Sequence, residues 1–148
     1  MIYKATEVAA YVVKVSEASG DVITQLKLQK ILYYIQGAFL ALKGEPAFSD
    51  EVLAWKYGPA VYTVFSEYKE FGNSPISASK SDIVISEADQ LFIKEIYNRY
   101  RGFSPSQLVS ITHNEAPWLN TAESDIISNR YLAHKFISTD RSIKKAVD

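Results

Sequence analysis

The stretch TQLKLQKILYYIQGAFLALKG, Thr24–Gly44, is the strongest secondary-structure signal in the chain. Thr24 is a favourable N-cap, and Gly44 suits the position just after a helix end, so the stretch predicts one long helix. Its apolar residues recur at three- and four-residue steps, which is the pattern of a helix that packs against a core. We predict that it is the central helix of the fold. The apolar stripe comprises Leu28, Ile31, Leu32, Ile35, Phe39 and Leu42.

Five further helices are predicted on either side of the central one. Gly58-Pro59 favours a helix start, because proline at the first helical position loses no hydrogen bond that the helix needs. Ser86 and Ser104 each open a capping-box pattern, in which a serine is followed three residues later by an acid or amide side chain. The predicted helices are Thr6–Ala18, Pro59–Glu70, Ser86–Tyr100, Ser104–His113 and Ser128–Ile137.

Extended structure is a minor part of the prediction. Val52–Tyr57 alternates weakly, and Ile76 with 83–85 are candidates for two brief paired strands. The tail 139–148 has few apolar anchors and is expected to fray. Because no repeat or linker divides the chain, we predict one mainly α domain over residues 1–148. It would contain about six helices around the central helix and one short two-stranded β element.

Composition excludes several classes of function. The chain has 148 residues, no cysteine and a net charge of −1. Without cysteine there is no disulfide framework, thiolate nucleophile or Cys-based zinc site. The balanced charge argues against nucleic-acid binding. No signal-peptide layout or membrane-spanning apolar run is present, so we expect a cytoplasmic protein that does not contact a membrane.

The segment SITHNEAPW, Ser110–Trp118, is the strongest candidate for chemistry. His113-Asn114-Glu115 fits the H-x-E that opens the zinc deaminase signature, but that signature also needs a P-C-x-x-C partner. The only other histidine is His134, and the spacing H-E-x-x-H is absent. An enzyme that uses His113 and Glu115, with or without a metal, is therefore the alternative hypothesis.

A structural corner is the interpretation that we favour for the same segment. In it, His113 bonds the last carbonyls of its helix, Pro117 directs the chain away, and Trp118 buries its ring with the indole N–H bonded. The sequence also lacks a nucleophile elbow and a glycine-rich phosphate loop. We thus predict no catalytic residue, no metal and no cofactor.

The other face of the central helix carries Lys27, Lys30 and Tyr34. Two interpretations stay open for the lysines: a solvated helix face, or a stripe that binds a partner. The chain has ten tyrosines, and aromatic residues are enriched at protein interfaces, which tilts the choice slightly towards binding.

Three segments together resemble one family. LKLQKILYYIQG (Leu26–Gly37), AWKYGPAVYTVF (Ala54–Phe65) and LVSITHNEAPW (Leu108–Trp118) occur in this order and at similar spacing in the SocA-like antitoxin family. That family is also called the Panacea domain and was formerly known as phage-associated protein GepA. NRYLAHKFIS (Asn129–Ser138) resembles the family's last helix, so the resemblance runs from about Leu26 to Phe136.

This resemblance implies a mainly helical antitoxin that neutralises the toxin of a neighbouring gene by direct protein–protein binding. One type of member serves as a proteolytic adaptor that hands its toxin to the ClpXP protease. The residues shared with the family are Leu28, Lys30, Tyr33, Tyr34, Trp55, Tyr57, Gly58, Pro59, Thr112, His113, Glu115, Pro117 and Trp118.

The shared residues are assigned two roles. We expect the segments that contain Trp55 and Trp118 to meet near the central helix, where they act as scaffold first and toxin contact second. The predicted structural residues are Gly58, Pro59, Thr112, Glu115 and Pro117. The predicted partner-binding residues are Lys27, Lys30, Tyr33, Tyr34, Trp55, Tyr57, His113 and Trp118.

Overall fold

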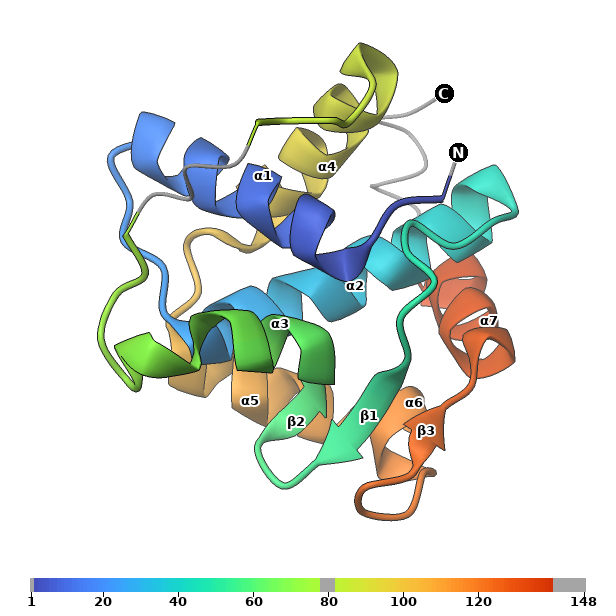
Figure 1. The fold of residues 1–148 in the computed structure, drawn as a ribbon. Helices are drawn as coiled ribbons and strands as arrows, with labels where there is room; N and C mark the ends of the chain where they lie inside the picture. The colour runs from blue at the N-terminus through green and yellow to red at the C-terminus, as the bar shows by residue number, and fades with distance from the viewer. Residues whose placement is uncertain (1, 78–81, 140–148) are drawn as a thin grey trace.

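A computed structural model, which describes residues 2–77 and 82–139, places the predicted central helix in α2, Gln25–Lys43. The Thr24 hydroxyl accepts a hydrogen bond from the Lys27 N–H, and Gly44 ends the helix with φ 73°. Five helices pack around α2 (Figure 1), and the mainly α fold is confirmed. These are α1 (Ala5–Ala18), α3 (Tyr62–Tyr68), α4 (Glu87–Tyr100), α5 (Pro105–His113) and α7 (Asn129–Thr139).

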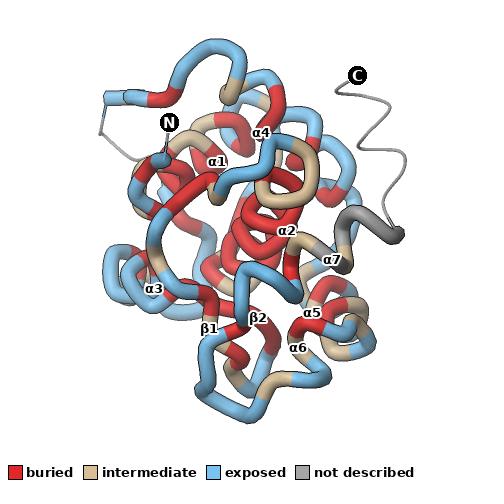
Figure 2. Tube along the Cα trace, turned by 90° about the vertical axis from the view of Figure 1, so that its right-hand side faces the viewer, coloured by how far each residue is buried: buried red, intermediate tan, exposed pale blue. Residues whose placement is uncertain are grey.

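Burial of α2 on all sides differs from the prediction of an amphipathic helix. Every residue from 27 to 39 is buried, so Lys27, Lys30 and Tyr34 do not form a solvated face (Figure 2). Buried polar groups need hydrogen-bond partners, and α2 finds them in the backbone of neighbouring loops. The Gln36 amide, for example, donates to the Phe48 carbonyl at 2.8 Å and accepts from the Ala47 N–H at 2.8 Å.

A three-stranded antiparallel sheet packs against α2 through one of its edge strands. Its strands are β1 (Val52–Trp55), β2 (Gly58–Ala60) and β3 (Ile126–Ile127), in the order β2-β1-β3. The predicted extended segment at 52–57 is thus confirmed as β1 and the turn that follows it. The predicted pairing of Ile76 with 83–85 is wrong, because the Ile76 N–H bonds the carbonyl of Ile23 before α2.

The predicted helix from Gly58-Pro59 begins three residues late. Pro59 lies in β2 opposite Ala54 of β1, and α3 starts only at Tyr62. The N–H of Ala54 donates to the carbonyl of Asp125, and its C=O accepts from the N–H of Ser124, both just before β3. Ala54 therefore needs no N–H from Pro59 on its other side. Proline therefore fits this position of an edge strand without losing a ladder hydrogen bond.

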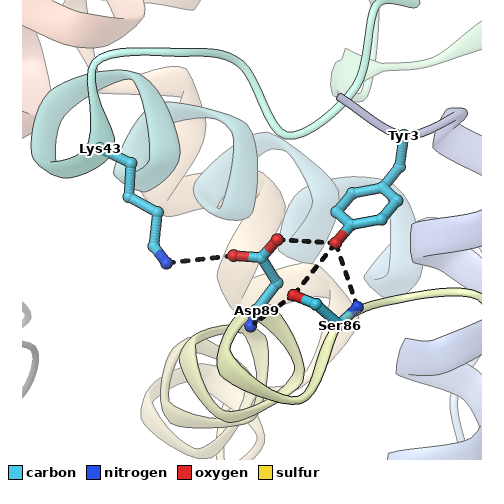
Figure 3. Close-up of polar contacts among 4 residues, drawn as sticks. All are labelled: Tyr3, Lys43, Ser86 and Asp89. Atoms are coloured by element: carbon cyan, nitrogen blue, oxygen red, sulfur yellow. Dashed lines mark hydrogen bonds and ion pairs between the residues drawn. The ribbon is translucent and has the colours of Figure 1, made fainter. Parts of the chain in front are cut away.

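The remaining predicted helices are confirmed, with one addition. The capping box at Ser104 forms, and at Ser86 the side chain caps α4. The Tyr3 hydroxyl donates to Asp89 at 2.7 Å and accepts from the Ser86 N–H at 3.1 Å, while Lys43 bonds the same carboxylate (Figure 3). These contacts join the N-terminus and the end of α2 to the start of α4.

The addition is a short helix, α6 (Ala116–Leu119), in the segment for which we favoured a structural corner. Lys69–Phe71 forms a 3-10 turn, η1, after α3. Apart from Thr139, the predicted frayed tail 139–148 lies outside the described residues.

Candidate functional site

The two tryptophan-containing segments meet beside α2, as predicted. The indole N–H of Trp118 in α6 donates to the main-chain carbonyl of Trp55 at the end of β1, at 2.8 Å. Pro117 is buried in the first turn of α6. One hydrogen bond thus joins segments that are 63 residues apart in the chain. This contact defines a corner that we call the tryptophan corner.

Gly58 lies where the remaining motif, the one in α2, meets the hairpin and α5. Its φ of 111° lies in a region that side-chain-bearing residues rarely adopt. A Cβ at this position would lie 2.5 Å from Cε of Lys30 and 2.9 Å from the Oγ1 of Thr112. Thr112 is fully buried, and its hydroxyl donates to the Val109 carbonyl at 3.0 Å. The hairpin, α2 and α5 can approach so closely because position 58 is glycine.

Side chains of α2 cover the outer edge of β2. The Lys30 amine donates to the Pro59 carbonyl at 3.1 Å. The Gln29 amide accepts from the Val61 N–H at 2.7 Å and donates to the Val61 carbonyl at 3.2 Å. An uncovered strand edge is a template for pairing with another chain, and these side chains occupy it. Burial lowers the pKa of Lys30 to about 7.

A half-buried carboxylate lies on the other side of the corner. Glu115 accepts hydrogen bonds from the hydroxyls of Tyr33 at 3.0 Å and Tyr34 at 3.2 Å. Lys135 of α7 forms an ion pair with it at 3.4 Å. Burial raises the pKa of Glu115, while Lys135 and the two hydroxyls oppose the shift. Burial and this carboxylate raise the pKa of the Tyr33 hydroxyl, which therefore remains a donor.

Replacing Glu115 by glutamine should change how stability depends on pH. Because the pKa of Glu115 is raised above its ordinary value of 4.5, the folded protein holds the proton more tightly than the unfolded chain. The free energy of unfolding should therefore fall as pH rises from about 4.5 through the raised pKa. The measurement is the free energy of unfolding in urea for wild type minus that for Glu115→Gln, at several pH values across this range. A difference that rises with pH would contradict the assignment.

His113 stacks on Trp118 rather than capping its helix. The ring centroids are 4.0 Å apart and the planes 18° from parallel. The cap is Asn114, whose amide donates to the Ser110 carbonyl at 3.0 Å. The prediction of a His113 cap is wrong because stacking aligns the imidazole with the indole instead. The Nε2 of His113 is buried and has no hydrogen-bond partner in the described chain.

His113 and Glu115 point to different partners, so the geometry gives no support to the enzyme alternative. The imidazole faces Trp118, whereas the carboxylate faces Tyr33, Tyr34 and Lys135. Among residues 2–77 and 82–139 no three His, Asp or Glu side chains gather closely enough to hold a metal ion. In that same part of the chain no helix has the length and apolar character needed to span a membrane.

Trp118→Phe should lower the free energy of unfolding by about 1–2 kcal/mol, because the Trp55 carbonyl loses its donor in a partly buried place. Trp55→Phe is the matched control, since it removes an indole from the same corner but leaves this hydrogen bond in place. Chemical denaturation measures both. Equal losses in the two variants would mean that the hydrogen bond contributes little.

The predicted partner-binding residues divide into an interior and a surface group. Lys30, Tyr33 and Tyr34 are each at most 1% exposed. Lys27 is also buried, and its amine donates to the Arg101 carbonyl at 2.6 Å. These four have no free surface for a partner, and we assign them to positioning the hairpin, the corner and α4. Trp55, His113 and Trp118 are half-buried, and Tyr57 is 61% exposed.

A hollow of about 990 Å³ opens beside the surface group, between the β1–β2 hairpin, the start of α2 and the end of α3. Trp55 packs edge-on against Phe65, with centroids 5.4 Å apart. Phe65 and its neighbour Tyr62 are exposed, although neither is among the predicted partner-binding residues. Leu26, Lys30, Trp55, Tyr57, Gly58 and Phe65 are among the residues that line the hollow.

The fold and the corner define a mainly helical domain in which the β1–β2 hairpin is held between the buried central helix and the segment of α5 and α6. The chain belongs to the family described as antitoxin SocA-like, Panacea domain, whose model matches residues 28–119. It is similar to Antitoxin SocA of Caulobacter vibrioides (strain NA1000 / CB15N), with 33% identity over 120 residues. That match covers 72% of this chain and 61% of the relative. No solved structure matches the chain.

Proposed function

We propose that this chain is the antitoxin of a toxin–antitoxin pair and neutralises, by direct binding, a toxin encoded by a neighbouring gene. The observation that carries the proposal is the family membership. The matched residues, 28–119, include the hairpin, the tryptophan corner and most of α2. The name of the similar protein, Antitoxin SocA, supports the same role.

Binding of this kind requires no catalytic residue, metal or cofactor, and we place it in the cytoplasm. Trp55 and Tyr57 are the proposed anchors, because aromatic side chains dominate interface energetics and these two reach the surface. His113 and Trp118 are a second proposed contact. If His113→Ala stays folded but no longer neutralises the toxin, the corner is a direct contact as well as a scaffold.

A proteolytic adaptor role is the finer proposal. In it, the chain holds the toxin and presents it to ClpXP, so that neutralisation includes removal of the toxin. The half-life of the toxin should then shorten when this chain is co-expressed, and the effect should vanish in cells lacking ClpXP. An unchanged half-life alongside restored growth would leave neutralisation by binding alone.

A growth assay tests the antitoxin proposal. The adjacent gene is expressed in a bacterial host alone and then together with this chain. Arrest by the neighbour alone and recovery with both are the expected results. A harmless neighbour, or one that stays toxic in the presence of this chain, would overturn the proposal. Gly58→Ala is an inactive control, because a Cβ at this position would overlap Lys30 and Thr112 and destabilise the fold.

A further inference from the structure

The charge that lines the hollow is opposite to that of the chain as a whole. Among the described residues around it, the exposed charged side chains are Lys56, Lys69 and Glu123, whereas the Lys30 amine is buried behind the hairpin. The whole chain has 17 acidic and 16 basic residues, for a net charge of −1. The exposed charges at the hollow are thus mainly positive, in a slightly acidic protein. A cleft with one predominant sign of charge attracts ligands of the other sign.

The walls of the hollow are aromatic. Trp55 and Phe65 form one edge-to-face pair, and Phe65 is 39% exposed. Tyr57 is 61% exposed, and the Lys56 amine lies over its ring, 5.5 Å from the centroid. Exposed aromatics beside cations are suited to an apolar side chain next to a carboxylate. At about 990 Å³ the space is at the upper end of the range for ligand pockets.

Hydrogen bonds from the interior hold these walls in place. The Gln25 amide donates to the Phe65 carbonyl at 3.1 Å, and Trp118 donates to that of Trp55. Lys30 and Gln29 hold β2. Because the frame is formed before any partner arrives, binding there would cost little ordering of the backbone.

We propose that the hollow is the docking site for the toxin, and that it receives an acidic segment of the toxin that carries an apolar side chain. Lys56 and Lys69 would contact the carboxylates, and Trp55 and Phe65 would contact the apolar group. This inference rests on the proposed antitoxin function and names the surface and the partner chemistry through which it would act.

The experiment measures the affinity of this chain for the product of the adjacent gene, at low and at high salt. Lys56→Glu and Tyr57→Ala alter the hollow; both residues are exposed, so the fold should persist, and circular dichroism checks this. Lys94→Glu and Leu91→Ala are matched controls, because both are exposed on α4 at the other end of the molecule (Figure 1). We expect each hollow variant to weaken binding about tenfold or more. The controls should bind like wild type.

The loss caused by Lys56→Glu should be larger at low salt than at high salt, because salt screens the attraction of exposed charges. If wild type binds and the hollow variants bind equally well, this inference is overturned while the antitoxin function stands. If wild type neither binds nor neutralises the product, both are overturned. If the hollow variants instead convert a dimer of this chain to a monomer without weakening toxin binding, the hollow is a contact between copies and the inference is again overturned.

Discussion

Gly58→Ala is expected to lower the free energy of unfolding by about 4 kcal/mol. Two effects contribute. Alanine at a φ of 111° is strained, and its Cβ would overlap Cε of Lys30 at 2.5 Å and the Oγ1 of Thr112 at 2.9 Å. Both neighbours are buried, so neither can move into solvent without opening the junction of α2, α5 and the hairpin. Urea denaturation of the purified variant measures the loss.

Gly44→Ala separates backbone strain from steric overlap. Gly44 also has a positive φ, of 73°, but nothing lies within 4 Å of a Cβ at that position. Its replacement should therefore cost only about 1 kcal/mol, the strain of the left-handed conformation. If the two variants lose the same stability, the Lys30 chain moves aside at little cost, and the close approach at Gly58 is not a constraint on the fold.

Helix boundaries were predictable because they depend on residues that are neighbours in the chain. Thr24 and Gly44 act through caps that span three or four residues, and the Ser104 capping box lies wholly within one turn. The exception is Gly58-Pro59. A glycine–proline pair also suits an edge strand, and only the pairing of Gly58–Ala60 with β1 decides between the two.

Burial of polar residues was not predictable in the same way. The spacing of the apolar residues in α2 indicates which side of the helix is most apolar. It does not indicate that five other helices pack around it. Lys30 and Gln29 look like surface residues until β2 is placed beside them. The ion pair of Glu115 with Lys135 depends on two segments that meet only in the folded chain, and no local pattern signals it.

The Lys30 amine should make stability rise with pH. In the folded protein burial lowers its pKa to about 7, from an ordinary value of 10.5. Between these values the unfolded chain binds the proton and the folded protein does not, so the free energy of unfolding increases as pH rises. The increase should reach about 4 kcal/mol between pH 7 and pH 10, relative to a variant that lacks the amine. Below pH 7 both states hold the proton, and the folded state bears the full cost of burying the ammonium.

Lys30→Met isolates this effect, because methionine is unbranched, fits irregular space and carries no proton. The measurement is the difference in unfolding free energy between wild type and Lys30→Met from pH 6 to pH 10. Lys94→Met is the control, because it makes the same substitution at an exposed position of α4. At pH 10 the variant should also be the less stable protein, since the Pro59 carbonyl has lost its donor. A flat difference for Lys30→Met would mean that the ammonium remains charged inside the fold, and that the junction of α2 and β2 contains a charge rather than a neutral amine.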